Sequence, residues 1–178
     1  VTEEEGYWYV AAYCGYIANK YTVSLQFYYS VDTQQVKAIR NAIQTAVDEC
    51  IRDGMSDVHK ALALHDYLVL HNAYDTSYSN YDAFDALVTG SSVCQGYAEA
   101  YQAMLNAVGI KSKVVSSEAM NHAWNLVQID GQWYHVDTTW DDPLSYYNEE
   151  DTPGFVGHTY FMCSDAQIQS LSHYGWET

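Results

Sequence analysis

Apolar residues recur every three or four positions in two successive stretches, which predicts two amphipathic helices. The first covers residues 33–52, and Asp32 precedes it as an N-cap candidate. The second begins after Ser56, another cap candidate, and ends near His71. It carries three histidines, which we expect at the surface or the core edge and not as ligands: His59, His65 and His71.

Residues before these helices alternate between apolar and polar positions, which is typical of a half-buried strand. The alternation is clearest from Tyr21 to Tyr29. Tyr7 to Tyr13 is the expected partner strand, joined through Gly15 to Lys20. We expect residues 1–30 to form an N-terminal β-hairpin extension, or the end of a preceding domain, and residues 31–178 to form the main domain.

A loop of small residues breaks the apolar pattern at Gly90–Ser92 and ends at Cys94. Helical spacing resumes at Tyr97 and stops at Gly109, which is typical of a C-cap. Cys94 is therefore predicted at the first turn of a helix, where free N–H groups and the helix dipole stabilise a thiolate. The same N–H groups could bind an oxyanion. A buried structural cysteine is the alternative interpretation.

Two aromatic and β-branched runs flank Asp130-Gly131, which is a strong signal for a tight β-hairpin. With these two residues at the turn, His122 lies opposite Thr139 on one face, and Asp137 on the same face is its diagonal neighbour. Such neighbours are about 7–8 Å apart at Cα, so an imidazole can donate to the carboxylate. His135 also falls on this face and is the competing partner, although it lies nearer the turn.

The remaining segments are less regular. Residues 72–92 are rich in Tyr and Asp. This composition indicates either a solvated connection or a loop that lines a groove beside Cys94. A strand is expected in residues 111–117, a last strand at His158–Cys163, and a short terminal helix after Ser164.

The net charge of −16 argues against binding to nucleic acid or to anionic membrane surfaces. No apolar run reaches about 18 residues, so we expect no membrane insertion. The chain of 178 residues begins at Val1 without a signal peptide, and we expect an excised or mature domain with further domains N-terminal to it. From this acidic net charge we expect an extracellular or cell-surface protein.

The four cysteines are widely spaced and contain no CxxC pair, which excludes a zinc ribbon. A disulfide between Cys14 and Cys50 is possible, but the sequence does not decide it. Cys163 is expected in a buried strand. No cofactor and no metal are expected. A metal-dependent hydrolase built on Cys94, His122 and His135 is the disfavoured alternative.

Three blocks together resemble the bacterial transglutaminase-like superfamily over roughly residues 35–175: 93–98 (VCQGYA), 122–125 (HAWN) and 133–141 (WYHVDTTWD). The resemblance implies an α+β fold with a papain-like core, helices on an antiparallel sheet and the nucleophile at a helix N-terminus. It further implies Cys94 as nucleophile, His122 as general base and acid, and Asp137 as the orienting carboxylate. A second oxyanion donor is implied upstream, with Tyr74 and Tyr81 as candidates.

The implied chemistry is acyl transfer on a peptide or protein amide through a thioester. Hydrolysis is the preferred outcome, and transglutaminase cross-linking is the alternative. A non-catalytic module that binds peptide or glycan is the competing class. Calcium dependence is not implied, and Asp141 and Asp142 are interpreted as solvated carboxylates.

Overall fold

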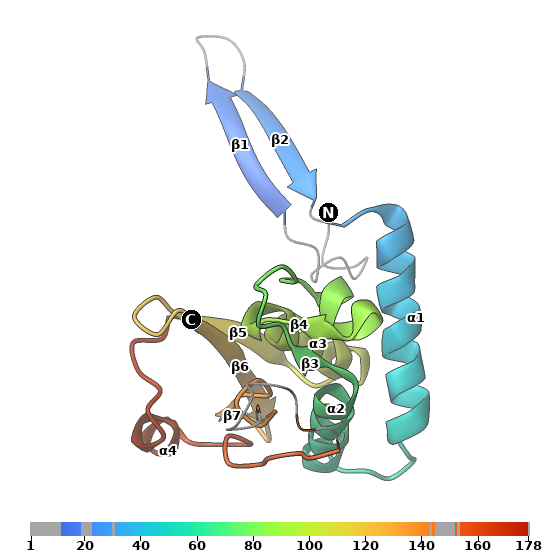
Figure 1. Cartoon of the computed structure of the whole chain (residues 1–178), viewed down its shortest axis with the longest axis vertical. Coiled ribbons are helices and arrows are strands. Elements are labelled where there is room, and N and C mark those ends of the chain that lie inside the picture. The colour runs from blue at the N-terminus through green and yellow to red at the C-terminus, as the bar shows by residue number, and fades with distance from the viewer. Residues whose placement is uncertain are drawn as a thin grey trace.

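The computed structural model describes residues 12–18, 23–29, 31–142, 144, 152 and 154–177. The fold is α+β, with helices packed on an antiparallel sheet (Figure 1). The main helices are α1 (Thr33–Cys50), α2 (Asp57–His71) and α3 (Cys94–Ala107). The three-stranded sheet has the order β5 (Ser112–Ser117), β6 (His122–Ile129), β7 (Gln132–Val136).

The first two helices begin where the sequence predicts. Asp32 caps α1 by accepting from the Gln34 and Gln35 N–H groups, and the Gln35 side chain accepts from the Asp32 N–H in return. Ser56 caps α2 by accepting from the His59 N–H. Each cap satisfies N–H groups that have no partner within the helix, which fixes the helix start.

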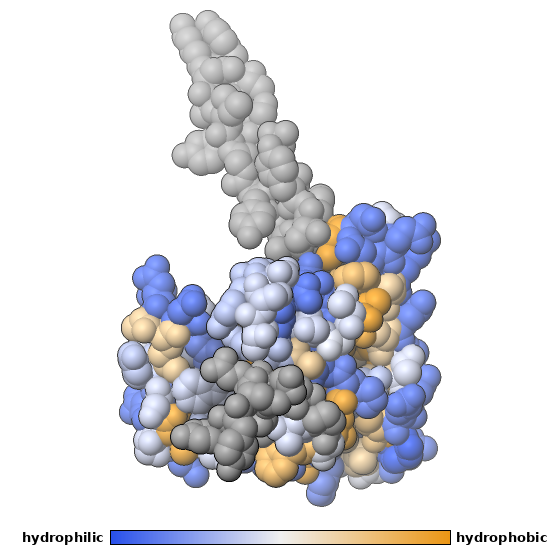
Figure 2. All heavy atoms as spheres, in the orientation of Figure 1, coloured by the Kyte–Doolittle hydropathy of each residue, from blue (hydrophilic) through white to orange (hydrophobic). Residues whose placement is uncertain are grey.

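Helix α3 is the central element of the core. It packs on β6 on one side and against α1 and α2 on the other. Tyr101, Met104 and Leu105 are fully buried in this position. Truncating a side chain such as Met104 to alanine would cost roughly 2–5 kcal/mol. Figure 2 shows the outer edge of the molecule over α1 as mainly hydrophilic, so the apolar face of α1 is directed at this core.

The β6–β7 hairpin has the predicted register. Ile129 pairs with Gln132 and Leu126 pairs with His135. Asp130 and Gly131 form the turn with φ values of 50° and 80°, as a type I′ turn requires. The ladder ends at Val136, so Asp137 lies just beyond the strand and not opposite Trp124 within it.

The segment between α2 and α3 contains more structure than the predicted loop. β3 (Ala73–Tyr74) pairs in parallel with β4 (Ser91–Ser92), and a π-helical turn, η2 (Asp85–Thr89), lies between them. Asp75 organises the intervening turn by accepting from the N–H groups of Ser77, Ser79 and Asn80. This short pairing brings Tyr74 next to the start of α3.

The predicted strand at His158–Cys163 is wrong. These residues form turns, and only Cys163 pairs with the sheet, through mutual backbone hydrogen bonds with His135. The Tyr160 N–H instead donates to the side chain of Asp141. Ser164 then caps α4 (Asp165–Ser170), as predicted.

The interpretation of Asp141 and Asp142 as solvated is also wrong, because both are buried. Asp141 accepts from Tyr160, and Asp142 accepts from the Tyr97 hydroxyl. Specific donors compensate for the loss of water around these carboxylates. His65 differs from expectation as well, since it is completely buried.

At the N-terminal end, β1 (Ala12–Ala18) and β2 (Val23–Tyr29) form an antiparallel hairpin, drawn as the pair of blue arrows in Figure 1. The predicted connection from Gly15 was wrong, because residues 15–18 belong to β1. Residues 7–11 of the predicted partner strand lie outside the described part. The domain boundary near residue 30 stays a prediction.

The thiols of Cys50, Cys94 and Cys163 are free. The side chain of Cys14 lies outside the described part, so its pairing with Cys50 stays a prediction. Cys163 is buried as predicted, but it pairs with His135 through an isolated β-bridge and is not part of a strand. Within the described ranges, no helix combines the length and apolar character needed to cross a bilayer.

Candidate active site

Cys94 is the first residue of α3. The N-cap residue Val93 has extended backbone (φ −83°, ψ 178°) and provides no side-chain cap. The N–H groups of the first turn therefore have no capping oxygen and are directed toward the end of the helix where the thiol lies. Positive potential from the helix dipole adds to their effect on a sulfur anion.

Gly96 explains how the preceding loop approaches this turn so closely. A Cβ at residue 96 would lie 2.6 Å from Ser92 Cβ and 2.8 Å from the Asp82 carbonyl oxygen. Neither atom is the end of a flexible side chain, so any larger residue would displace the loop or the first turn. The glycine two residues after the cysteine is thus a packing requirement that fixes the position of Cys94.

The structure brings Cys94, His122 and Asp137 together. His122 Nε2 donates to Asp137 Oδ2 at 2.6 Å. The Cys94 thiol lies close enough to His122 that each shifts the pKa of the other, and the Ala123 N–H also lowers the pKa of the thiol. Because Nε2 faces Asp137, Nδ1 is the nitrogen that remains for the sulfur. The imidazole of His122 therefore lies between the thiol and a buried carboxylate.

Asp137 is completely buried and accepts four hydrogen bonds. Oδ1 accepts from the Thr139 and Trp140 N–H groups at 3.0 and 3.1 Å. Oδ2 accepts from His122 and from His173 Nε2, the latter at 2.8 Å. A carboxylate with four donors, two of them imidazoles, stays ionised and has little freedom to rotate.

These contacts shift the pKa values in a direction that favours a thiolate–imidazolium pair. Burial raises the pKa of the Cys94 thiol, but the hydrogen bond and charge of His122 outweigh it and the net change is a lower pKa. Burial would lower the pKa of His122, but Asp137 and Cys94 raise it to about 9. Burial likewise raises the pKa of Asp137, and its two histidine partners bring it below its usual value.

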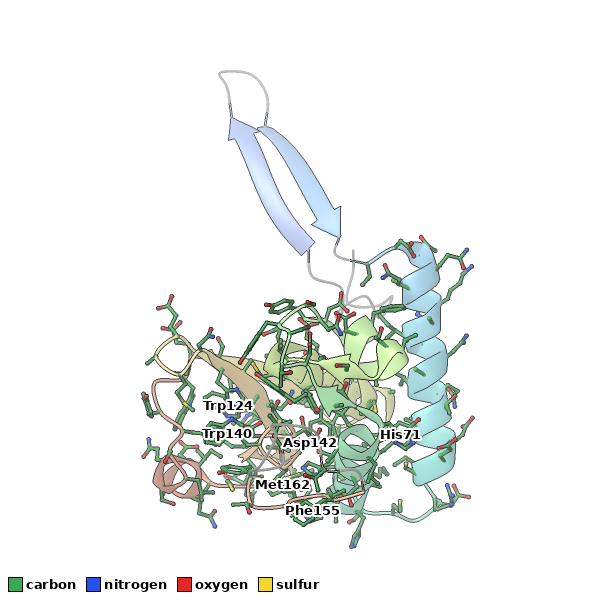
Figure 3. All side chains as sticks on the ribbon, viewed as in Figure 1. His71, Trp124, Trp140, Asp142, Phe155 and Met162 are labelled. Atoms are coloured by element: carbon green, nitrogen blue, oxygen red, sulfur yellow. The ribbon has the colours of Figure 1, made fainter. Side chains whose placement is uncertain are left out.

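Two tryptophans hold the His122 ring. Trp124 stacks on one side with ring centroids 5.7 Å apart, and Trp140 stacks with centroids 5.3 Å apart. Figure 3 labels both indoles, which come from β6 and from the turn after β7. Stacking restricts rotation of the imidazole, so the ring keeps one nitrogen toward Asp137 and the other toward the sulfur.

Residues of the three sequence blocks also tie α3 to its neighbours. Asn125 donates to the Ala98 carbonyl of α3 at 2.9 Å, which joins the helix to β6. The Tyr97 hydroxyl donates to Asp142, which joins the helix to the turn after β7. These bonds hold Cys94 and His122 at a fixed separation although the residues lie on different elements.

His135, the competing histidine, does not contact Asp137 through its ring. Its Nδ1 accepts from Trp124 Nε1 at 2.9 Å, and its Nε2 faces Asp165 at 3.2 Å. The metal-ligand set of Cys94, His122 and His135 is therefore not assembled. His173 is the second histidine that donates to Asp137, and sequence analysis missed it, because it follows a short helix and lies in no recognisable motif.

Cys94 and His122 border a cleft of about 490 Å³. Its other side is lined by aromatic residues of the segment after α2: Tyr74, Tyr78 and Tyr81. A second cleft of about 290 Å³ lies on the far side of His122 and is lined by Thr139, Trp140 and Leu144 among others. Tyr74 and His122 line both clefts, so the imidazole lies where the two meet, and the thiol of Cys94 lines the first. The predicted groove beside Cys94 is present.

The comparisons with known proteins agree with this fold. A sequence model described as the Transglutaminase-like superfamily matches residues 44–138, and the chain belongs to this superfamily. A solved structure described as a crystal structure of a TGase superposes with a TM-score of 0.51 and 20% identity, over 69% of this chain and 39% of that one.

Two curated relatives are Kyphoscoliosis peptidases. The Mus musculus protein is 24% identical over 126 residues, which cover 60% of this chain and 19% of that protein. The Homo sapiens protein is 24% identical over 145 residues, which cover 69% and 22%. The chain thus spans about a fifth of the length of these relatives.

Proposed function

We propose that this domain is a cysteine-dependent acyl-transfer enzyme that hydrolyses peptide or protein amides, with Cys94 as nucleophile. The observation that supports this most strongly is the arrangement of Cys94, His122 and Asp137, in which His122 is hydrogen-bonded to Asp137 and lowers the pKa of a thiol at a helix N-terminus that borders an open cleft. A binding module has no need for a thiol of lowered pKa at this place.

In the proposed reaction, the Cys94 thiolate attacks the amide carbonyl carbon, and the carbonyl oxygen becomes an oxyanion. As this intermediate collapses, the C–N bond breaks and the imidazolium of His122 gives its proton to the leaving amine. The product is a thioester on Cys94. Neutral His122 then takes a proton from water, the resulting hydroxide attacks the thioester, and the acid product leaves Cys94 free.

The oxyanion is assigned to the backbone N–H of Cys94 and the hydroxyl of Tyr74. Burial and the nearby Cys94 raise the pKa of Tyr74 to about 12, so the phenol keeps its proton and can donate throughout the working range. Tyr81 is the weaker candidate, because 52% of it is exposed and it lines only the larger cleft.

The two clefts favour an extended substrate. A peptide that crosses the ridge at Cys94 and His122 would place residues on both sides of the scissile bond in contact with Tyr74, Trp140 and their neighbours. Water can reach a thioester in an open cleft, which favours hydrolysis over transfer to an amine. The printed name of the curated relatives, peptidase, points in the same direction.

A peptide library tests the proposal, with wild type compared with Cys94→Ala and with Cys50→Ala as a matched thiol control. New peptide termini should form with wild type and Cys50→Ala and be absent with Cys94→Ala. Ammonia release and incorporation of a labelled primary amine, measured in parallel, report the cross-linking alternative. Cleavage that persists in Cys94→Ala would contradict the proposal, and amine incorporation without new termini would replace hydrolysis by transglutamination.

A further inference from the structure

We propose that His65, Asp66 and His158 form a zinc-binding site between α2 and the segment before α4. Their ligand atoms (a ring nitrogen of each histidine and a carboxylate oxygen) lie within 4.8 Å of one another. His65 Nδ1 lies 3.0 Å and His158 Nε2 lies 2.8 Å from the same oxygen, Asp66 Oδ1. Residues 92 positions apart in the chain thus converge on one point.

Both ring nitrogens of His65 face a carboxylate oxygen. Its Nδ1 faces Asp66, and its Nε2 faces Asp141 Oδ2 at 3.2 Å. A neutral imidazole has one donor nitrogen and one acceptor nitrogen, and ionised carboxylates only accept. One nitrogen of a neutral His65 would therefore place its lone pair against a carboxylate lone pair. Either a second ring proton or a metal ion between Nδ1 and Asp66 removes this conflict, and the two are distinguished by the metal content of the protein.

Asp141 has the position of a supporting residue in such a site. Metal-bound histidines usually donate their second ring N–H to a carboxylate, which fixes the tautomer and the ring orientation. His65 is completely buried, and Asp141 is 1% exposed and held by the Tyr160 N–H. With Nε2–H donating to Asp141, Nδ1 keeps its lone pair for the ion.

The ligand types favour zinc. Two imidazole nitrogens and one carboxylate oxygen, with the fourth position open to water, form a common zinc set. Zinc bonds of about 2.0–2.2 Å place neighbouring ligand atoms about 3.3 Å apart. The two pairs at 2.8 and 3.0 Å would open by a few tenths of an ångström, and the two imidazole nitrogens, which lie within 4.8 Å of each other, would close on the ion. Calcium needs six or more oxygen ligands, and this site offers too few. Asp66 and His158 are partly exposed, which leaves a path for entry.

A zinc ion here would join α2 to the segment before α4. Figure 3 labels Phe155 and Met162 of this segment, which passes close to α2. The same segment supports Asp137, because the Asp137 N–H donates to the Tyr160 carbonyl at 3.1 Å. The ion would therefore stabilise the turn behind the candidate active site without touching Cys94. This inference is independent of the proposed acyl transfer.

The test uses the full chain with Cys94→Ala, so that the thiol cannot bind zinc itself. Zinc content after dialysis and titration calorimetry should give one ion per chain, together with a higher melting temperature. His158→Ala and Asp66→Asn should each weaken binding at least about tenfold. His59 is an exposed histidine on the same helix, so the control variant His59→Ala should bind zinc as tightly as the Cys94→Ala chain does.

Cobalt(II) bound in place of zinc should give visible d–d bands without the near-ultraviolet charge-transfer band of a thiolate ligand. These bands should disappear in His158→Ala. Absence of stoichiometric zinc binding, or equal binding by His158→Ala, Asp66→Asn and His59→Ala, would overturn the site. His65 would then be held between Asp66 and Asp141 by a proton alone. Circular dichroism confirms that each variant is folded.

Discussion

Replacing Asp137 by asparagine should remove most of the activation of Cys94. The side chain keeps its shape and can still accept from the Thr139 and Trp140 N–H groups. It loses the negative charge that His122 faces at 2.6 Å. The imidazolium is then no longer stabilised, and burial alone acts to lower its pKa.

The size of the effect follows from the pKa of His122, which is about 9 in the folded protein. An unperturbed imidazole titrates near 6.5, so its surroundings favour the imidazolium by roughly 3 kcal/mol. Asp137 and Cys94 share this contribution and also overcome the opposing effect of burial. Removing the share of this free energy that Asp137 provides should lower the population of the thiolate–imidazolium pair at pH 6 by roughly ten- to a hundredfold.

Alkylation by iodoacetamide measures this population, because only the thiolate reacts. Rates at Cys94 should be followed by peptide mass spectrometry from pH 5 to pH 9. Cys50 and Cys163 act as internal references, since burial raises the pKa of both thiols. In wild type, Cys94 should react first and well below pH 8, whereas in Asp137→Asn its profile should move up by about 1–2 pH units.

Asp165→Asn is the matched control, because Asp165 pairs with His135 and is separate from the thiol. Its Cys94 profile should equal that of wild type. Circular dichroism and the melting temperature show whether Asp137→Asn is folded. A folded Asp137→Asn with an unchanged alkylation profile would refute the reasoning, since the carboxylate would then have no influence on the thiol.

Further changes test other parts of the site. Gly96→Ala should destabilise the fold by about 1–3 kcal/mol and slow Cys94 alkylation, measured by urea unfolding and mass spectrometry, because its Cβ would meet the Asp82 carbonyl at 2.8 Å. Tyr74→Phe should lower kcat for peptide cleavage by about 10²–10³ with little change in KM, whereas Tyr81→Phe should not. The pH profile of kcat/KM should be bell-shaped. It should rise as Cys94 loses its proton, at a pH below the usual thiol pKa, and it should fall above about pH 9 as the imidazolium of His122 loses its proton. Equal effects of the two tyrosine changes, or a profile that keeps rising above pH 10, would contradict the assigned roles.

Local patterns were sufficient to predict the elements that hold the candidate site. The Asp130-Gly131 turn sets the hairpin register, and the chain that leaves this hairpin at Val136 brings Asp137 to His122. The small-residue loop before Cys94 predicts the helix start, because caps and helix ends depend on neighbouring residues only. These features arise from interactions within a few residues of one another.

Contacts between distant segments could not be predicted in the same way. His173 reaches Asp137 from the end of the chain, and no periodicity connects the two. Asp141 was predicted to be solvated because an acidic pair usually lies at the surface. In the structure it is buried, and its carboxylate is hydrogen-bonded to His65 and to the Tyr160 N–H. The same burial changed His65 from an expected surface residue into part of a polar cluster. Such placements depend on tertiary packing, which overrides local preference.

The most direct test of the central claim is to trap the acyl-enzyme. Wild type would be mixed with an activated ester of a cleaved peptide, quenched in acid and examined by intact and peptide mass spectrometry. The account predicts one acyl group in thioester linkage on Cys94, with its rate of formation reduced in His122→Ala. Acylation of Cys50 or Cys163 instead, or formation on Cys94 at the wild-type rate in His122→Ala, would contradict it.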